Sequence, residues 1–208
     1  MSSAVSYDRA VDLTDVPHIA RSGIKIGLFT AVAVLLFSLV SRFTGGAVEA
    51  ILGAVIVAAG IFVVTFLPGI WTNPRTIEGI AGAAGIGLAG AIVFLIVDVL
   101  LLQRIGTYSN RWRAIGGGSN WWYHPVWWMV GSFLPWMGAF ILSNQAARGE
   151  PSVGRAAGLV AGLTLVFASL GVLLHVPHAG WTLGSFAVAV LPALAAATAI
   201  TGLGSRRS

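Results

Sequence analysis

Six stretches of apolar residues follow one another along the chain, separated by shorter connections that are polar or contain glycine and proline. They span residues 24–43, 48–70, 78–103, 125–144, 154–176 and 180–203. A helix needs about 20 such residues to cross ~30 Å of hydrocarbon. The stretches lack the two-residue alternation of membrane β-barrel strands. Because backbone groups in lipid must be hydrogen-bonded within their own segment, the pattern predicts an all-α fold: a polytopic membrane protein with six transmembrane helices in one domain.

The composition supports this prediction. Hydrophobic residues make up 57% of the chain and charged residues only 9%, with a mean hydropathy of +0.88. Soluble domains carry about 25% charged residues, so a water-soluble globule, a coiled coil and a disordered chain are excluded. The chain contains no cysteine, which also excludes disulfides, thiolate metal sites and a catalytic thiol.

The charged residues predict how the chain is oriented. Residues 1–23 form a polar tail without the features of a signal peptide, expected to be cytoplasmic or interfacial, and residues 204–208 form a short basic tail. With six crossings both tails lie on one side, which carries Arg9, Arg21, Lys25, Arg75, Arg148, Arg155, Arg206 and Arg207. The other side carries Arg42, Arg104, Arg111 and Arg113. This bias predicts cytoplasmic termini, as in a bacterial inner-membrane protein. The cations form no cluster, so no nucleic-acid partner is expected.

Small residues recur every four positions in several spans and predict where helices pack closely. These stripes are Gly79-Ala83-Gly87-Ala91 and Ala81-Gly85-Ala89 in the third span, Gly154-Gly158-Gly162 in the fifth, Ala50-Ala54-Ala58 in the second and Ala189-Ala193-Ala197 in the sixth. Two stripes on one helix place the third span centrally in the bundle. Pro135 and Pro192 fall inside spans, where proline kinks a helix; bundles place such prolines at cavities and hinges, but also commonly without a functional role.

Aromatic residues and histidines gather on the side opposite the termini. The candidate cofactor-binding residues there are His124, His175, His178, Trp127, Trp128 and Trp136. The tryptophans fit either an aromatic belt at the lipid headgroups or a surface for a flat ligand or partner subunit. The histidines are either hydrogen-bonded helix ends or axial ligands of a tetrapyrrole. A tetrapyrrole, a carotenoid and a quinone are the candidate cofactors, and no metal site of the His-carboxylate type is expected.

Asp98 is the one acidic residue deep inside a predicted span. An acid in the membrane requires a partner, and Arg42 lies at a matching depth at the end of the first span. We therefore predict a structural ion pair between Asp98 and Arg42. Arg111 and Arg113 of the long connection are alternative partners, and a proton relay or ion site is an alternative role.

No motif in the sequence indicates a particular enzymatic reaction. The chain lacks a GxSxG nucleophile, a phosphate-binding loop with its lysine and paired metal ligands, so we predict that it is not an enzyme. The sequence favours a non-catalytic accessory or assembly subunit of a larger membrane complex, with photosynthetic and electron-transport assemblies as the analogy. Its expected partners are other integral membrane subunits and lipids rather than a soluble substrate. The alternative is a transporter or channel for a small solute or lipid.

Overall fold

The computed structural model describes residues 14–73, 75–108 and 123–205, and all regular elements in these ranges are helical. They are α1 (Val16–Phe43), α2 (Gly46–Trp71), α3 (Ile77–Val97), the π-helical turn η1 (Asp98–Leu102), α5 (Tyr123–Ala146), α6 (Val153–Leu173) and α7 (Leu183–Ser205). Within the described residues, six helices are long and apolar enough to cross a membrane, α3 and η1 forming one of them. The predicted all-α, six-helix membrane bundle is confirmed.

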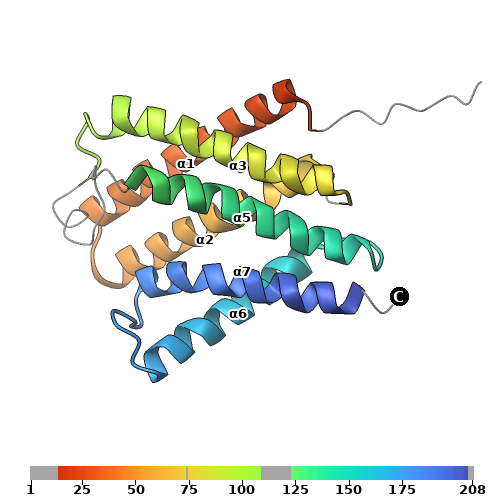
Figure 1. Cartoon of the computed structure of the whole chain (residues 1–208). Helices are drawn as coiled ribbons and strands as arrows, with labels where there is room; N and C mark the ends of the chain where they lie inside the picture. The colour runs from red at the N-terminus through yellow and green to blue at the C-terminus, as the bar shows by residue number, and fades with distance from the viewer. Residues whose placement is uncertain (1–13, 74, 109–122, 206–208) are drawn as a thin grey trace, which may run out of the picture.

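Successive helices run in opposite directions, so their ends gather at two faces of the bundle (Figure 1). We call the face that holds Val16 and Ser205 the terminal face. The opposite face, which holds the ends of α1, η1 and α6, is called the loop face. Residues 109–122, which the sequence places in the long connection of this face, lie outside the described residues.

Several helix boundaries differ from the apolar stretches; α7, for example, begins at Leu183 rather than at residue 180. The first helix begins at Val16 rather than at residue 24, so residues 16–23 belong to α1 and not to a tail. Pro17 lies in the first turn of α1, where backbone N–H groups have no partner within the helix, so the N–H that proline lacks is not needed. The polar residues that follow Pro17 are also helical. The fifth span ends at Leu173, since His175 adopts a left-handed φ of 54°. Residues 1–13 and 206–208 lie outside the described part of the chain.

Helix α3 packs most extensively against α1 and α5, so its two stripes have neighbours on two sides as predicted, but α5, which contacts α2, α3, α6 and α7, is the more central helix. Its first stripe, Gly79-Ala83-Gly87-Ala91, is buried along its length. Its second stripe meets α1: a Cβ placed on Gly23 would stand 2.5 Å from the Cβ of Ala89. The two stripes therefore serve two neighbours.

The closest crossings occur where a glycine faces backbone. A Cβ on Gly87 of α3 would overlap the carbonyl oxygen of Gly131 and the Cγ of Pro135 in α5. A Cβ on Gly138 of α5 would overlap the carbonyl oxygen of Thr65 in α2. At these two points α5 is held against α3 and α2 at a distance that only glycine permits.

Two of the predicted stripes do not pack within the chain. Gly154, Gly158 and Gly162 are exposed, and a Cβ on Gly158 or Gly162 would meet no described atom within 4 Å. The second-span stripe Ala50-Ala54-Ala58 is exposed as well, whereas Ala189-Ala193-Ala197 of α7 is buried. The reason is that α6 lies at the edge of the bundle and turns its other face, which carries Ala156 and Val160, toward the core.

The glycine crossing at α3 predicts a stability difference. Replacement of Gly87 by Leu should lower the free energy of unfolding by about 3 kcal/mol or more, because the side chain would enter the backbone of α5. The same replacement at exposed Gly162 should change it by less than about 0.5 kcal/mol. Unfolding of both variants by sodium dodecyl sulfate in mixed micelles measures the difference, and equal stability would show that the α3–α5 crossing is not close.

Candidate functional site

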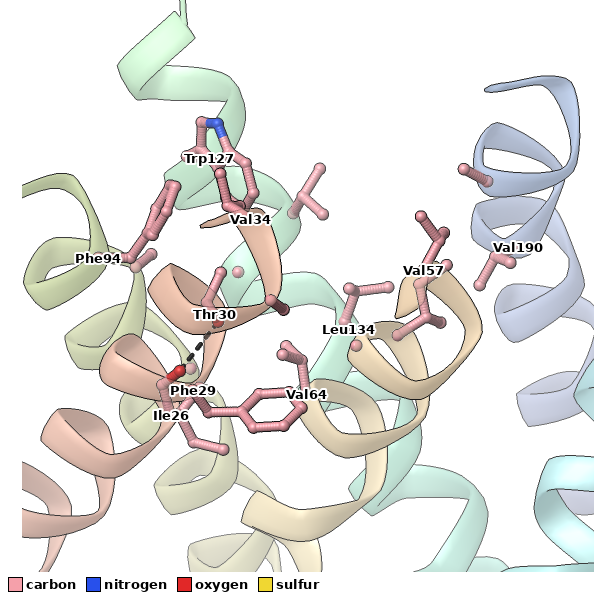
Figure 2. Close-up of a pocket in the computed structure, with 18 of the residues that line it drawn as sticks. Ile26, Phe29, Thr30, Val34, Val57, Val64, Phe94, Trp127, Leu134 and Val190 are labelled. Carbon is pink, nitrogen blue, oxygen red and sulfur yellow. Dashed lines mark hydrogen bonds between the residues drawn. The ribbon is translucent and has the colours of Figure 1, made fainter. Parts of the chain in front are cut away.

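A cavity of about 510 Å³ lies between α1, α2, α3, α5 and α7 (Figure 2). Its volume falls in the range of ~300–1,000 Å³ that is usual for small-molecule sites. The wall combines aliphatic side chains from all five helices with aromatic rings such as those of Phe29, Phe94 and Trp127. None of these lining positions could be grouped from sequence, because they come from five segments far apart in the chain.

The wall of the cavity is almost entirely apolar. Thr30, Tyr108 and Trp127 are the only lining residues whose side chains carry a polar atom. The Thr30 hydroxyl donates to the carbonyl of Ile26 at 2.9 Å within α1, and the Tyr108 hydroxyl donates to the carboxylate of Asp98. Both hydroxyls are thus already hydrogen-bonded, and the surface suits hydrocarbon.

Prolines mark the helices around the cavity. Three lining residues stand four positions before a proline: Val64 before Pro68, Gly131 before Pro135 and Val188 before Pro192. Proline has no N–H to donate to the carbonyl four residues earlier, and its ring pushes that turn apart. The predicted association of Pro135 and Pro192 with a cavity is therefore matched by their position, and Pro68 repeats it on α2.

The tryptophans of α5 divide into two groups. Trp127 is half-buried, lines the cavity and packs on fully buried Phe94, with ring centroids 4.5 Å apart. Trp128 and Trp136 are both 45% exposed and do not line the cavity. The side chains that the sequence grouped as one surface therefore face two different environments: an internal cavity and the outside of the bundle.

The histidines are not brought together at the cavity. His175 and His178 are exposed in the connection between α6 and α7, both with a left-handed φ, and neither lines the cavity. His124 belongs to the first turn of α5, but its side chain lies outside the described residues. Among the residues that the structure describes, no three of His, Cys, Asp and Glu are grouped as metal ligands would be. A cofactor-binding role for these histidines stays a prediction.

Asp98 is fully buried, but the predicted ion pair with Arg42 is not formed. Its two carboxylate oxygens accept hydrogen bonds from the Gln103 amide, at 2.7 Å, and from the Tyr108 hydroxyl. Arg42 is exposed and donates instead to the carbonyl of Gly106 at 2.5 Å. The prediction failed because the chain after α3 folds back and offers Asp98 nearer, uncharged donors.

The segment Gln103–Tyr108, which we call the strap, is held on both sides. Its carbonyls at Gly106 and Thr107 accept from Arg42 and from buried Ser38 of α1. Its side chains at both ends donate to Asp98 of η1. The strap thus joins η1 to the end of α1 at the loop face, where Tyr108 reaches the cavity wall.

Sequence reasoning missed the donors of the strap. Gln103 and Tyr108 stand five and ten positions after Asp98, spacings that do not share a face of an α-helix. The π-helical turn changes this, with the Gln103 N–H donating to the carbonyl of Asp98, five residues back, at 2.9 Å. The sequence feature that could have indicated these donors is an intramembrane acid followed by polar residues near the end of its helix.

Double-mutant cycles on the free energy of unfolding show whether Asp98 interacts with Tyr108, as observed, or with Arg42, as the sequence predicted. We expect Asp98→Ala and Tyr108→Phe to show a coupling free energy of about 1–3 kcal/mol, because they remove the two ends of one buried hydrogen bond. Asp98→Ala and Arg42→Gln should be additive within about 0.5 kcal/mol, since their side chains do not meet. Strong coupling to Arg42 with none to Tyr108 would restore the ion pair and refute the strap.

Comparison of the chain with protein families, curated proteins and solved structures finds no match in any of the three. The residues that form the cavity, the strap and the outer tryptophan surface are therefore the basis on which function is argued.

Proposed function

We propose that this protein is a non-catalytic membrane subunit that holds a lipophilic molecule in the cavity between α1, α2, α3, α5 and α7. The observation that carries the proposal is an apolar volume of about 510 Å³ inside the bundle. The wall is apolar and several of its residues are also exposed on the outside of the bundle, so in a membrane this space is filled by hydrocarbon, which a bound lipophilic molecule can supply.

The wall narrows the choice among the candidate cofactors. A tetrapyrrole is held through an axial ligand such as histidine, and no histidine is among the cavity residues that the structure describes. A carotenoid or a quinone needs no such ligand and offers the cavity mostly carbon and hydrogen. We therefore propose a lipophilic ligand that needs no axial ligand, a quinone or another lipid with a long hydrocarbon chain.

The outside of α5 supports a partner in the membrane. Trp128, Met129 and Trp136 are exposed, and the Ser132 hydroxyl between the two tryptophans donates to the carbonyl of Trp128 at 2.7 Å. This leaves a largely apolar surface with large rings, of the kind enriched where subunits meet. We propose that it docks on other subunits of a bioenergetic or photosynthetic complex in a bacterial inner membrane, with the terminal face toward the cytoplasm. An aromatic belt at the headgroups is the other interpretation.

A lipid or small-solute transporter is the second candidate, and the position of the cavity favours it. On α5 and α7 the lining runs only from Val126 to Leu134 and from Ala187 to Leu191, which is the loop-face half of these helices. Toward the terminal face the same helices pack tightly around Ile141. On α1, α2 and α3 the lining residues lie near the middle of the helices. A lipophilic site near the middle of the bilayer resembles one state of a carrier.

Filling the cavity should remove the ligand. Gly60 lines it, and a Cβ there would meet no described atom within 4 Å, so Gly60→Leu should fold and occupy the space. We expect native mass spectra and visible absorption spectra of the protein, extracted from its own membranes, to show a lipophilic ligand that this variant loses. Gly162→Leu, on the exposed side of α6, is the matched control and should keep it. The cavity is not the site if both variants retain the ligand equally.

The docking surface has a separate test. Replacing Trp128 and Trp136 together by Leu should reduce the yield of a larger complex in mild detergent by about ten-fold or more, as expected for large interface anchors. Trp181→Leu removes a tryptophan that is 67% exposed at the loop face and should leave the complex intact. Gel-filtration mass of the extracted particle measures the result, and an undiminished complex in the double variant argues against the docking surface.

A further inference from the structure

We infer that the ligand of the cavity is a single hydrocarbon chain, one leaflet long, with its polar end group at the loop face. This inference rests on the proposed function and names its ligand by shape and orientation. Three features of the cavity carry it: its depth, the position of its polar atoms and its volume.

The depth of the cavity matches half a bilayer. On α1 the lining runs from Ile26 to Phe37, which is about 16 Å at ~1.5 Å per residue. The hydrocarbon core is ~30 Å thick, so this is close to the length of one leaflet. The shallow end lies near the loop face, where Tyr108 lines the wall, and the deep end lies in the middle of the bundle beside Val64.

The polar atoms of the wall give the ligand a direction. Tyr108 and Trp127, whose side chains pair an apolar ring with a polar group as residues at the lipid headgroups do, line the cavity toward the loop face, and the Tyr108 hydroxyl is itself bonded to Asp98. The deep half carries Ile26, Phe29 and Val64, and its one hydroxyl, that of Thr30, is bonded to backbone. A polar group at the deep end would lose its water without finding a partner on the wall, so the chain points inward and the head group outward.

The volume sets the length of the chain. An apolar cavity of about 150 Å³ holds one benzene ring, so about 510 Å³ accommodates roughly twenty carbon atoms. A fully extended chain of this size is longer than the cavity is deep, so the chain must bend within it, and it can be acyl or isoprenoid. It can enter sideways from the bilayer, because lining residues Phe29, Val126 and Val188 are also 36%, 44% and 67% exposed.

The test is competition binding to the purified full-length protein in detergent. Fatty acids of increasing length and linear isoprenoid alcohols are measured against a radiolabelled acyl chain of about eighteen carbons. We expect affinity to peak at about 16–20 carbons and to fall for longer chains. A stronger peak in one series identifies the chain as acyl or as isoprenoid, and either result supports the inference.

Variants locate the chain within the cavity. Gly60 lies midway along the α2 part of the wall, so Gly60→Leu should weaken binding of the best chain about ten-fold and binding of a chain of about ten carbons by less. Leu134→Ala shortens a side chain of the wall and so enlarges the cavity, which should shift the chain length of highest affinity to longer chains. This variant also replaces Gly60→Leu as the test if Gly60→Leu does not fold. Gly162→Leu should change neither value.

The failure of this inference differs from the failure of the proposed function. If a tailless naphthoquinone binds better than every chain and Gly60→Leu abolishes its binding, the cavity binds a ligand but the single-chain assignment is wrong. If affinity does not depend on chain length but the cavity variants still change it, the cavity again binds a ligand and the single-chain assignment is again wrong. If neither chains nor rings bind, or if cavity variants have no effect on binding, the proposed function itself is overturned.

Discussion

The bundle depends on the contact between Gly87 of α3 and the backbone of α5 at Gly131. Lipid tails are as apolar as the surface of a transmembrane helix, so the hydrophobic effect does not drive these helices together. They associate where small residues let their backbones come into contact. Pro135 has no N–H to offer the Gly131 carbonyl, and that oxygen lies against Gly87, where any side chain would collide with it. A proline that breaks a hydrogen bond in one helix is thus accommodated by a glycine in its neighbour.

This close crossing also explains the cavity. Gly87 and Gly131 both belong to its wall, and α3 stands tightly between α1 and α5. On the other side of the space, branched side chains such as Val57 and Val190 keep α2 and α7 from a comparable approach (Figure 2). Uneven packing of six helices therefore produces an apolar space at one side of the bundle, and Tyr108 of the strap lines it toward the loop face.

The sequence predicted the transmembrane helices better than it predicted which helices pack against each other. Six spans and the two sides on which α3 has neighbours follow from hydropathy and small-residue spacing, which are local properties. A stripe such as Gly154-Gly158-Gly162 shows that a helix can be approached closely, but not that a helix of the same chain does so; here it is exposed.

The site was harder to foresee for the same reason. Asp98 was correctly identified as an acid that needs a partner, yet its donors come from a π-helical turn and a strap that helical periodicity does not describe. The inward direction of Trp127 and the outward direction of Trp128 depend on how α5 is rotated against α3. A cavity built by five helices is a property of tertiary packing alone.

The most direct test of this account is a crystal structure of the protein pressurised with xenon, which binds in apolar cavities. The account predicts density that is not protein in the space bounded by Val57, Leu134 and Val190, either as xenon or as an elongated bound chain that excludes it. Side chains of α2, α5 and α7 packed against one another there, with no such density, would contradict it.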